Sequence, residues 1–211
     1  MTDDVTTAAL DSWVRRFAAL VGEERDHLTE LDSAIGDADH GTNLDRGMKA
    51  AVVALDELGP AGAGPLFTKV GMTLVSTVGG ASGPLFGTLF MRMGSSFGDV
   101  TTASPEQVCA ALRAGLEGVV ARGKAQAEDK TMYDALAPAV DALEAGLKDG
   151  RGLGEALAEA RAAADAGRDA TTPMLARKGR ASYLGERSVG HQDPGATSTA
   201  LLVAAAADAL A

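Results

Sequence analysis

Apolar side chains recur along most of this chain at the three- and four-residue intervals of an amphipathic helix. The first apolar face is made by Leu10, Trp13, Val14, Phe17, Leu20 and Val21. The same spacing predicts further helices at about 23–33, 43–58, 66–78, 84–97, 105–122, 131–147, 153–166 and 197–211. Helical periodicity therefore accounts for most of the chain.

Several predicted helices carry start or stop signals. Gly36 is a candidate left-handed stop for the second helix, and the glycine and proline at 59–60 close the third. Ser104, Pro105 and Gln107 form a helix start, in which the serine caps, the proline takes the first position and the glutamine completes a capping box. These signals support short turns between consecutive helices.

The chain shows no two-residue alternation bounded by hairpin turns and no alternation of strands with helices. The predicted fold class is therefore all-α, an up-and-down antiparallel bundle of seven or eight amphipathic helices. The loosest internal point, 149–154, is typical of a turn between helices rather than of a linker. We expect a single domain over residues 1–211.

Charge excludes some function classes. The formal net charge is −10, which disfavours nonspecific binding to nucleic acid or to an anionic membrane surface.

One cysteine, Cys109, can form neither an internal disulfide nor a zinc site. There is no N-terminal targeting signal and no apolar run of membrane-spanning length, so we expect a cytoplasmic protein.

Three carboxylates, Asp32, Asp37 and Asp39, surround Gly36 and precede a helix that begins near Asn43. Clustered carboxylate oxygens are ligands for hard divalent cations. The amides at a helix start favour an anion. This pattern predicts a metal-bridged phosphate, and a metal would also reverse the local sign of charge in an acidic protein.

Other interpretations of this segment stay open. Asp and Gly are common in ordinary turns. The twelve-residue loop and terminal glutamate of an EF-hand are missing. A histidine, His40, stands beside the aspartates and is compatible with zinc or manganese, or with a contact to a nucleotide phosphate.

A glycine-rich segment at 79–83 is the second candidate, because glycines let backbone amides approach a ligand closely and Ser82 offers a hydroxyl. It is not a Walker A loop, since no Gly-Lys-Ser/Thr follows and no strand precedes it. Tight packing of small residues explains the segment equally well.

Two further segments, 123–132 and 177–195, combine charge with turn residues. Asp129 and Thr131 are accounted for as ordinary helix-start residues. Residues 177–195 are too polar and glycine-rich for a core helix, and such long irregular loops are usually functional or disordered. The concentration of positive charge there suits a phosphoryl group.

Together these segments resemble the L subunit of dihydroxyacetone kinase, the nucleotide-binding part of that enzyme. The matching motifs, which occur in order and span essentially the whole chain, are 31–41 (LDSAIGDADHG), 76–87 (STVGGASGPLFG), 122–124 (RGK) with 129–132 (DKTM), and 176–198 (ARKGRASYLGERSVGHQDPGATS).

The resemblance implies a closed barrel of about eight antiparallel amphipathic helices with the nucleotide, ADP or ATP, across one end. It implies that Asp32, Asp37 and Asp39 bind two Mg²⁺ ions that hold the phosphates. The implied nucleotide contacts are His40, Gly41, Thr42 and Asn43 at a helix start, Ala81 and Ser82 at the phosphates, Gly123 and Met132 at the adenine, and Arg180 with Asp193, Pro194 and Gly195 closing over the site. Of these, Arg180 is the expected catalytic residue, and the backbone of Thr42 would make its contact.

The resemblance leaves two working forms. In one, this domain is fused to a substrate domain and uses free ATP. In the other, the L subunit keeps ADP as a coenzyme, a K subunit holds dihydroxyacetone, and an M subunit charged by the phosphoenolpyruvate phosphotransferase system rephosphorylates the ADP. The chain starts at a methionine and contains only the L part, so we expect the second form. An ATP-dependent kinase for another short ketose, a signalling module that reports nucleotide state and a homodimer remain alternatives.

Overall fold

The structure, a computed structural model, describes residues 4–59 and 61–211. Its α-helices are α1 (Thr7–Glu23), α2 (Arg25–Ile35), α3 (His40–Leu58), α4 (Ala63–Thr77), α5 (Ser82–Phe97), α6 (Pro105–Gly123), α7 (Tyr133–Lys148), α8 (Leu153–Ala170) and α9 (Pro194–Leu210). A 3₁₀ segment, η1 (Arg180–Ser188), precedes α9, and two short strands, β1 (Val5–Thr6) and β2 (Thr102–Ala103), pair with each other. The predicted all-α class is confirmed.

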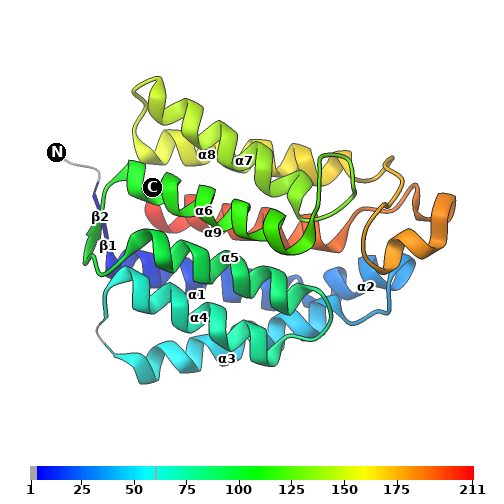
Figure 1. The fold of residues 1–211 in the computed structure, drawn as a ribbon, viewed down its shortest axis with the longest axis horizontal. Helices are drawn as coiled ribbons and strands as arrows, with labels where there is room; N and C mark the ends of the chain where they lie inside the picture. Colours follow the sequence, from blue (N-terminus) through cyan, green and yellow to red (C-terminus); the bar gives the residue numbers. More distant parts are fainter. Residues whose placement is uncertain (1–3, 60) are drawn as a thin grey trace.

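The long helices close into a ring within the described chain. Its order is α1–α3–α4–α5–α6–α7–α8–α9, and α9 packs back against α1 (Figure 1). The remaining helix, α2, lies at one end of the ring against the start of α3. None of the helices in the described part of the chain combines the length and apolar character that a membrane span requires. The antiparallel bundle predicted from the helical periodicity is therefore present, and it closes into the barrel that the resemblance implies.

Aromatic side chains fill the middle of the barrel. Trp13 and Phe17 from α1 are fully buried with Phe67 from α4 and Phe90 from α5. Each large apolar side chain buried in this way contributes roughly 1.5–3 kcal/mol. The indole Nε1 of Trp13 donates to the backbone oxygen of Leu202 at 2.9 Å, which ties α1 to α9 where the ring closes.

Glycines spaced by seven residues bring α4 and α5 into close contact. A Cβ added at Gly71 would lie 2.7 Å from the carbonyl oxygen of Gly87, and one added at Gly94 would lie 2.8 Å from that of Gly64. These distances are too short for any side chain, so the two helices can pack this closely only because both faces carry glycine.

Some predicted boundaries were wrong. Helix α3 begins at His40, before the expected start at 43, and α8 continues to Ala170. Gly36 ends α2 but with φ −139° and ψ −136°, so it is not a left-handed stop; Ala38 adopts φ +62° instead. Gly59 follows α3 with φ +69°, and its predicted partner Pro60 lies outside the described residues.

The β1–β2 pair was not predicted. Val5 pairs with Ala103 and Thr6 with Thr102 in antiparallel register. Two residues per strand cannot display a two-residue alternation, so the sequence pattern contains no signal for them. The pair fastens the start of the chain to the α5–α6 connection, at the end of the barrel away from α2 (Figure 1).

Candidate functional site

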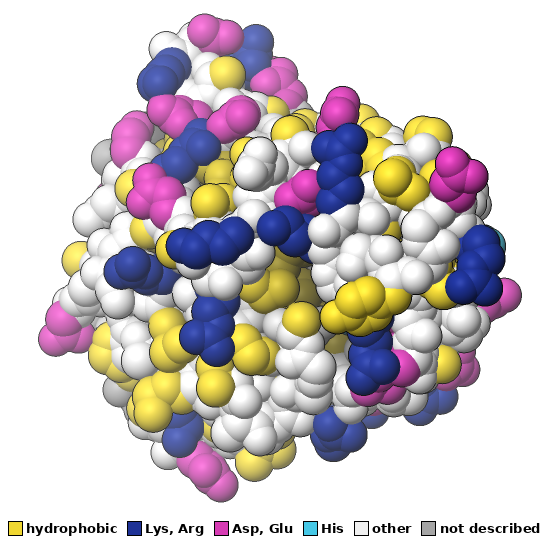
Figure 2. Space-filling model, turned by 45° about the vertical axis from the view of Figure 1, so that its right-hand side comes forward, with side chains coloured by type: hydrophobic (Ala, Val, Ile, Leu, Met, Phe, Trp, Pro, Cys, Tyr) yellow, Lys and Arg dark blue, Asp and Glu magenta, His cyan; other side chains and the backbone are white. Residues whose placement is uncertain are grey.

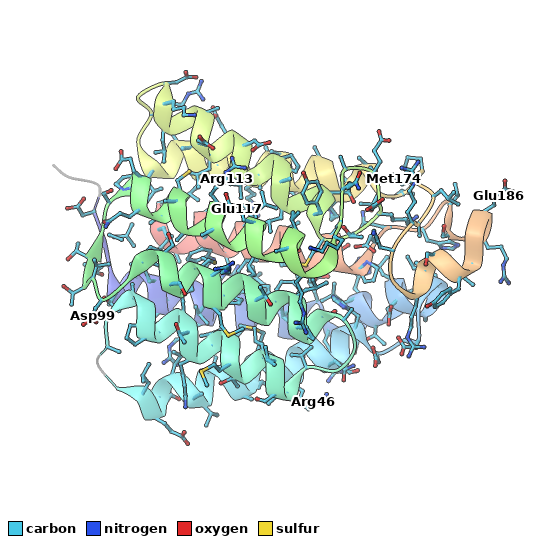
Figure 3. All side chains as sticks on the ribbon, viewed as in Figure 1. Arg46, Asp99, Arg113, Glu117, Met174 and Glu186 are labelled. Carbon is cyan, nitrogen blue, oxygen red and sulfur yellow. The ribbon has the colours of Figure 1, made fainter. Side chains whose placement is uncertain are left out.

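A pocket of about 460 Å³ lies at the end of the barrel that carries α2 and η1. The α2–α3 link, the α4–α5 turn, the loop before α7, η1 and the start of α9 all contribute to its walls. Met174 and Glu186 lie at this end, opposite Asp99 (Figure 3). On the face seen in Figure 2, Lys and Arg side chains surround a hollow. A concave site built from converging loops on a rigid scaffold is typical of ligand binding.

The three predicted metal ligands meet at one wall of this pocket. One carboxylate oxygen from each of Asp32, Asp37 and Asp39 lies within 4.8 Å of the others. Asp32 belongs to the last turn of α2 and is 8% exposed, whereas Asp37 is exposed on the link to α3. A donor set made only of carboxylate oxygens fits a hard cation such as Mg²⁺.

The backbone around the aspartates holds Asp32 in place. Its Oδ2 atom accepts the backbone N–H groups of Asp39 at 2.8 Å and His40 at 3.2 Å. A Cβ at Gly36 would lie 2.0 Å from Asp32 Oδ1. Gly36 is therefore needed for the space that it leaves to this carboxylate, not for a left-handed backbone.

His40 does not join the carboxylates. Its Nδ1 atom lies 3.0 Å from Ser82 Oγ, and its Nε2 atom lies 3.0 Å from Ser198 Oγ. Burial lowers the pKa of His40 below the ordinary histidine value, and the nearby carboxylates of Asp32 and Asp39 only partly oppose this. Both ring nitrogens of His40 contact hydroxyl groups, so neither is free to bind a metal ion. This disfavours the interpretation of His40 as a zinc or manganese ligand.

Gly41 and Thr42 are the two predicted site residues that do not line the pocket. Gly41 faces α2, because a Cβ there would lie 2.0 Å from the carbonyl oxygen of Arg25. Thr42 is exposed, and its hydroxyl donates to the backbone oxygen of Asp39 at 3.0 Å. Contacts from their backbone amides remain a prediction.

The α4–α5 turn forms a second wall. Gly80 adopts φ +67°, a conformation that favours glycine, and the turn leads into α5 at Ser82. Ala81 and Ser82 line the pocket, as does Asn43 from the first turn of α3. The N-termini of α3 and α5 therefore lie at this pocket, and the partial positive charge of each favours an anion.

The loop between α6 and α7 contains a residue whose importance the sequence did not indicate. Lys130 is 1% exposed, and its Nζ atom donates to the carbonyl oxygens of Ser188 at 2.6 Å, Met174 at 3.1 Å and Thr172 at 3.4 Å. Burial lowers the pKa of Lys130, and Asp193 opposes this. Lysine side chains are usually exposed, so nothing in the sequence indicated that this one is buried.

The same loop brings Gly123 and Met132 to the pocket. Asp129, treated above as an ordinary helix-start residue, is buried, and its side chain accepts the N–H of Gln126 at 2.9 Å. Asp134, which the sequence analysis did not single out, accepts the N–H groups of Glu128 and Thr131. The two carboxylates stabilise the loop from inside.

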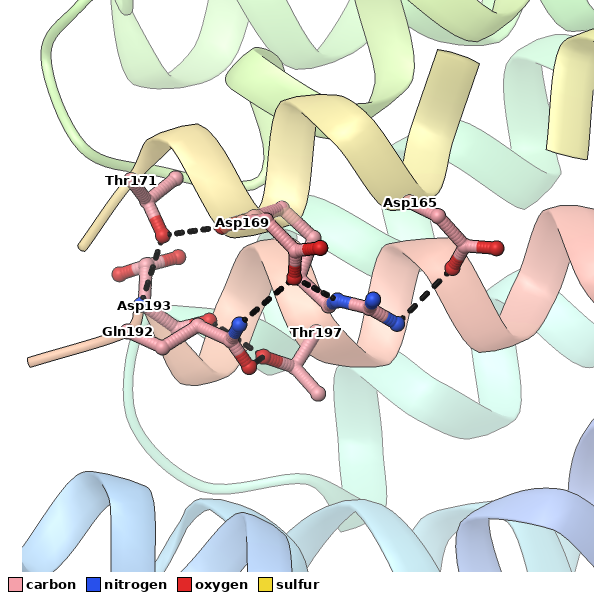
Figure 4. A network of polar contacts seen from close by, with 7 residues as sticks. Asp165, Asp169, Thr171, Gln192, Asp193 and Thr197 are labelled. Atoms are coloured by element: carbon pink, nitrogen blue, oxygen red, sulfur yellow. Dashed lines mark hydrogen bonds and ion pairs between the residues drawn. The ribbon is translucent and has the colours of Figure 1, made fainter. Parts of the chain in front are cut away.

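The connection between α8 and α9, residues 171–193, is ordered by packing and hydrogen bonds. Ala181 and Leu184 pack against Ile35 of α2 in a small apolar cluster, whereas Tyr183 is 87% exposed. Figure 4 shows the polar contacts at its two ends, where Gln192 donates to Asp169 at 3.1 Å and the N–H of Asp193 donates to Thr171 Oγ1 at 3.0 Å. The contacts place the start of α9 beside the pocket.

Asp193 begins α9 and is 8% exposed. Its Oδ2 atom accepts the N–H of Ala196 at 2.7 Å, which caps the helix. Burial raises the pKa of Asp193 to about 7; the carboxylates of Asp134 and Asp32 add to the rise, and the Ala196 N–H and Lys130 oppose it. Pro194 and Gly195, the next two residues, also line the pocket.

Arg180 reaches the aspartate cluster. Its Nη2 atom lies 3.0 Å from Asp37 Oδ2, although its side chain is 69% exposed. Lys178, part of the positive charge expected to suit a phosphoryl group, also lines the pocket, and so does Arg122, which was not expected to contact the ligand. The structure thus brings together the predicted metal, phosphate and closing residues, and adds further cations to the pocket wall.

Comparisons with known proteins show which family this chain belongs to. The model of the DAK2 domain matches residues 34–208. The chain is 43% identical over 192 residues to the PEP-dependent dihydroxyacetone kinase, ADP-binding subunit DhaL, of Escherichia coli (strain K12), covering 91% of both chains. It is 45% identical over 191 residues to PEP-dependent dihydroxyacetone kinase 1, ADP-binding subunit DhaL, of Listeria innocua serovar 6a, covering 90% of both.

A solved structure has the same fold. The dihydroxyacetone kinase from C. freundii in complex with AMP-PNP and Mg²⁺ superimposes with a TM-score of 0.73 at 28% sequence identity. The match covers 95% of this chain and 34% of the C. freundii chain.

Proposed function

Since the chain belongs to the DAK2 domain family, as an L-type subunit, we propose that it is the ADP-binding subunit of a phosphoenolpyruvate-dependent dihydroxyacetone kinase. In this proposal the whole chain is one nucleotide-binding domain that holds ADP or ATP as a coenzyme. A K subunit presents dihydroxyacetone, and an M subunit of the phosphotransferase system restores ATP in place. The names of the E. coli and L. innocua relatives support this assignment over the free-ATP form.

One observation carries the proposal: three carboxylates lie within 4.8 Å of one another in a pocket that two helix N-termini also reach. Carboxylates alone would repel a polyphosphate. Helix amides alone would bind one without needing acids. The combination is explained by metal ions that bridge the acids to phosphates, and we propose that Asp32, Asp37 and Asp39 hold two Mg²⁺ ions.

The other pocket residues would contact different parts of the nucleotide. When bound, Mg²⁺ would neutralise phosphate charge and so favour phosphoryl transfer. Ala81 and Ser82 at the start of α5 face the proposed phosphates. Gly123 and Met132, beside the apolar side chains of Leu85 and Val119, offer a surface for the adenine ring.

We assign Arg180 the role of a cationic contact to the transferred phosphoryl group. Its guanidinium pairs with Asp37, so it already lies at the wall where the phosphates would bind. In the transfer, the substrate hydroxyl oxygen bonds to the γ-phosphorus as the bond from that phosphorus to the bridging oxygen breaks. Such a reaction depends on in-line positioning and charge neutralisation. We expect no covalent nucleophile from this chain.

The test is mass spectrometry of nucleotide released from protein purified without added ATP. We expect ADP in the wild-type protein. Asp37→Ala should abolish retention, because it removes one of the three metal ligands. Asp26→Ala is the matched control: Asp26 is an exposed α2 carboxylate, paired with Arg25, that does not line the pocket.

Circular dichroism verifies that both variants are folded. Retention of ADP by folded Asp37→Ala at the wild-type level would contradict the metal-bridge assignment. A wild-type protein that carries no nucleotide and exchanges ATP rapidly would instead favour the free-ATP form of the kinase.

A further inference from the structure

Arg46 lies on α3 one turn after Asn43, is exposed, and does not line the pocket. Its guanidinium nevertheless makes three hydrogen bonds: Nη2 donates to Asn43 Oδ1 at 2.7 Å and to the backbone oxygen of Thr77 at 3.1 Å, and Nε donates to the same oxygen at 3.3 Å. Figure 3 shows Arg46 on the outside of the bundle. One exposed side chain therefore links the first turn of α3 to the last residue of α4.

Close packing of the two helices makes this link feasible. A Cβ at Gly47 would lie 2.1 Å from Val78 Cγ2, so α3 can approach the end of α4 only because position 47 is glycine. The last carbonyl groups of a helix have no partner within it and carry partial negative charge. Arg46 satisfies the carbonyl of Thr77, directly before the α4–α5 turn.

The contact with Asn43 determines which way its carboxamide points. A guanidinium has only donors, so the atom that faces it must be the carbonyl oxygen of the amide. The NH₂ group of Asn43 is then directed toward the turn: a Cβ at Gly79 would lie 3.0 Å from Asn43 Nδ2 and 3.6 Å from Oδ1. Asn43 itself is 8% exposed and lines the pocket.

From this geometry we infer that Arg46 is a positioning residue for phosphate binding, acting through Asn43. This inference rests on the proposed nucleotide function. With Arg46 in place, Asn43 presents N–H donors beside the glycine turn, where an anion is expected. Without it the carboxamide can rotate and present its oxygen, which repels a phosphate.

The test is isothermal titration calorimetry of Mg-ADP with nucleotide-free protein. Arg46→Met keeps most of the side-chain stem and removes every donor, and we expect about tenfold weaker binding, the size of one charged hydrogen bond. Arg15→Gln is the control, since Arg15 also bridges two helices, pairing with Asp11 of α1 and Asp56 of α3, but does not line the pocket. It should bind like the wild type.

A second measurement separates positioning from simple support of the fold. If Arg46 acts through Asn43, Arg46→Met should cause no further loss of affinity in an Asn43→Ala background, whereas a general structural role would weaken binding equally in both backgrounds. Should Arg46→Met fold poorly, Arg46→Lys serves instead, because an ammonium lacks the planar fork that contacts Asn43 and Thr77 together.

The outcomes are distinct. Wild-type affinity in folded Arg46→Met, or an equal loss in the Asn43→Ala background, overturns the inference while leaving the nucleotide function intact. No binding of Mg-ADP by the wild-type protein overturns the proposed function and this inference with it.

Discussion

Among single residues of the site, Asp193 is a buried carboxyl group whose pKa is raised. It caps α9 while buried near Lys130 and two other carboxyl groups, and its pKa rises to about 7. A raised pKa means that the folded protein binds the proton more tightly than the unfolded chain. The stability from this group is therefore complete below about pH 4, the ordinary aspartate range, and is lost as the pH rises through about 7.

Asp193→Asn should remove this pH dependence, because asparagine also caps helices but does not titrate. The free energy of unfolding of the wild type should fall relative to that of the variant as the pH rises from about 4 to about 7. Urea unfolding of both proteins across this range, in EDTA and without nucleotide, measures the difference. Parallel curves would show that Asp193 titrates in its ordinary range.

Single site residues could be predicted from the sequence where the residue type has specific chemistry and the spacing along the chain forms a motif. Asp32, Asp37 and Asp39 were expected to act together, and they form one cluster. Lys130 and Arg46 were not expected to matter. Their roles come from contacts with carbonyl oxygens on other elements, and such contacts depend on the tertiary arrangement rather than on residue type or spacing.

Among the elements, the α8–α9 connection is held in place by contacts with other segments. It carries Lys178 and Arg180 to the pocket, and Lys130 ties it to the α6–α7 loop through three carbonyl groups. The N–H of Arg177 donates to the backbone oxygen of Asp129 at 3.0 Å and adds a second tie.

Lys130→Met should loosen this connection. Methionine has a similar volume but leaves the three carbonyl oxygens without their donor, at a cost of about 1–3 kcal/mol for an unsatisfied buried group. Hydrogen-exchange mass spectrometry should show faster exchange in residues 171–193 while α4 and α5 keep their protection. Nucleotide affinity should fall in parallel.

The control for this prediction is Ser104→Ala, which breaks the observed capping box of α6 at the other end of the barrel and costs about 1 kcal/mol. It should lower stability without faster exchange in residues 171–193. Equal exchange in that segment for the wild type and Lys130→Met would contradict the proposed tie.

Element boundaries were predictable where local signals exist. The capping box at Ser104 and Gln107 is present, and the apolar periodicity located the helices. The β1–β2 pair and the early start of α3 were missed. Both depend on partners outside the element itself: β1 on the α5–α6 connection, far along the chain, and the first turn of α3 on the Asp32 carboxylate of α2.

On the scale of the whole molecule, a chain with a formal net charge of −10 has to bind a polyanion. The barrel brings two helix N-termini and the cationic side chains of Arg122, Lys178 and Arg180 to one end. It also places three carboxylates there, which only bound cations can make compatible with phosphate. We therefore expect nucleotide binding to depend on metal.

Calorimetric titration of emptied, well-folded protein with ADP, in Mg²⁺ and separately in EDTA, tests this requirement most directly. We predict saturable heat in Mg²⁺ and binding at least about tenfold weaker in EDTA, because the carboxylates would then repel the phosphates. Equal affinity in both buffers would contradict the metal bridge, and no heat from either ADP or ATP in Mg²⁺ would contradict the nucleotide site itself.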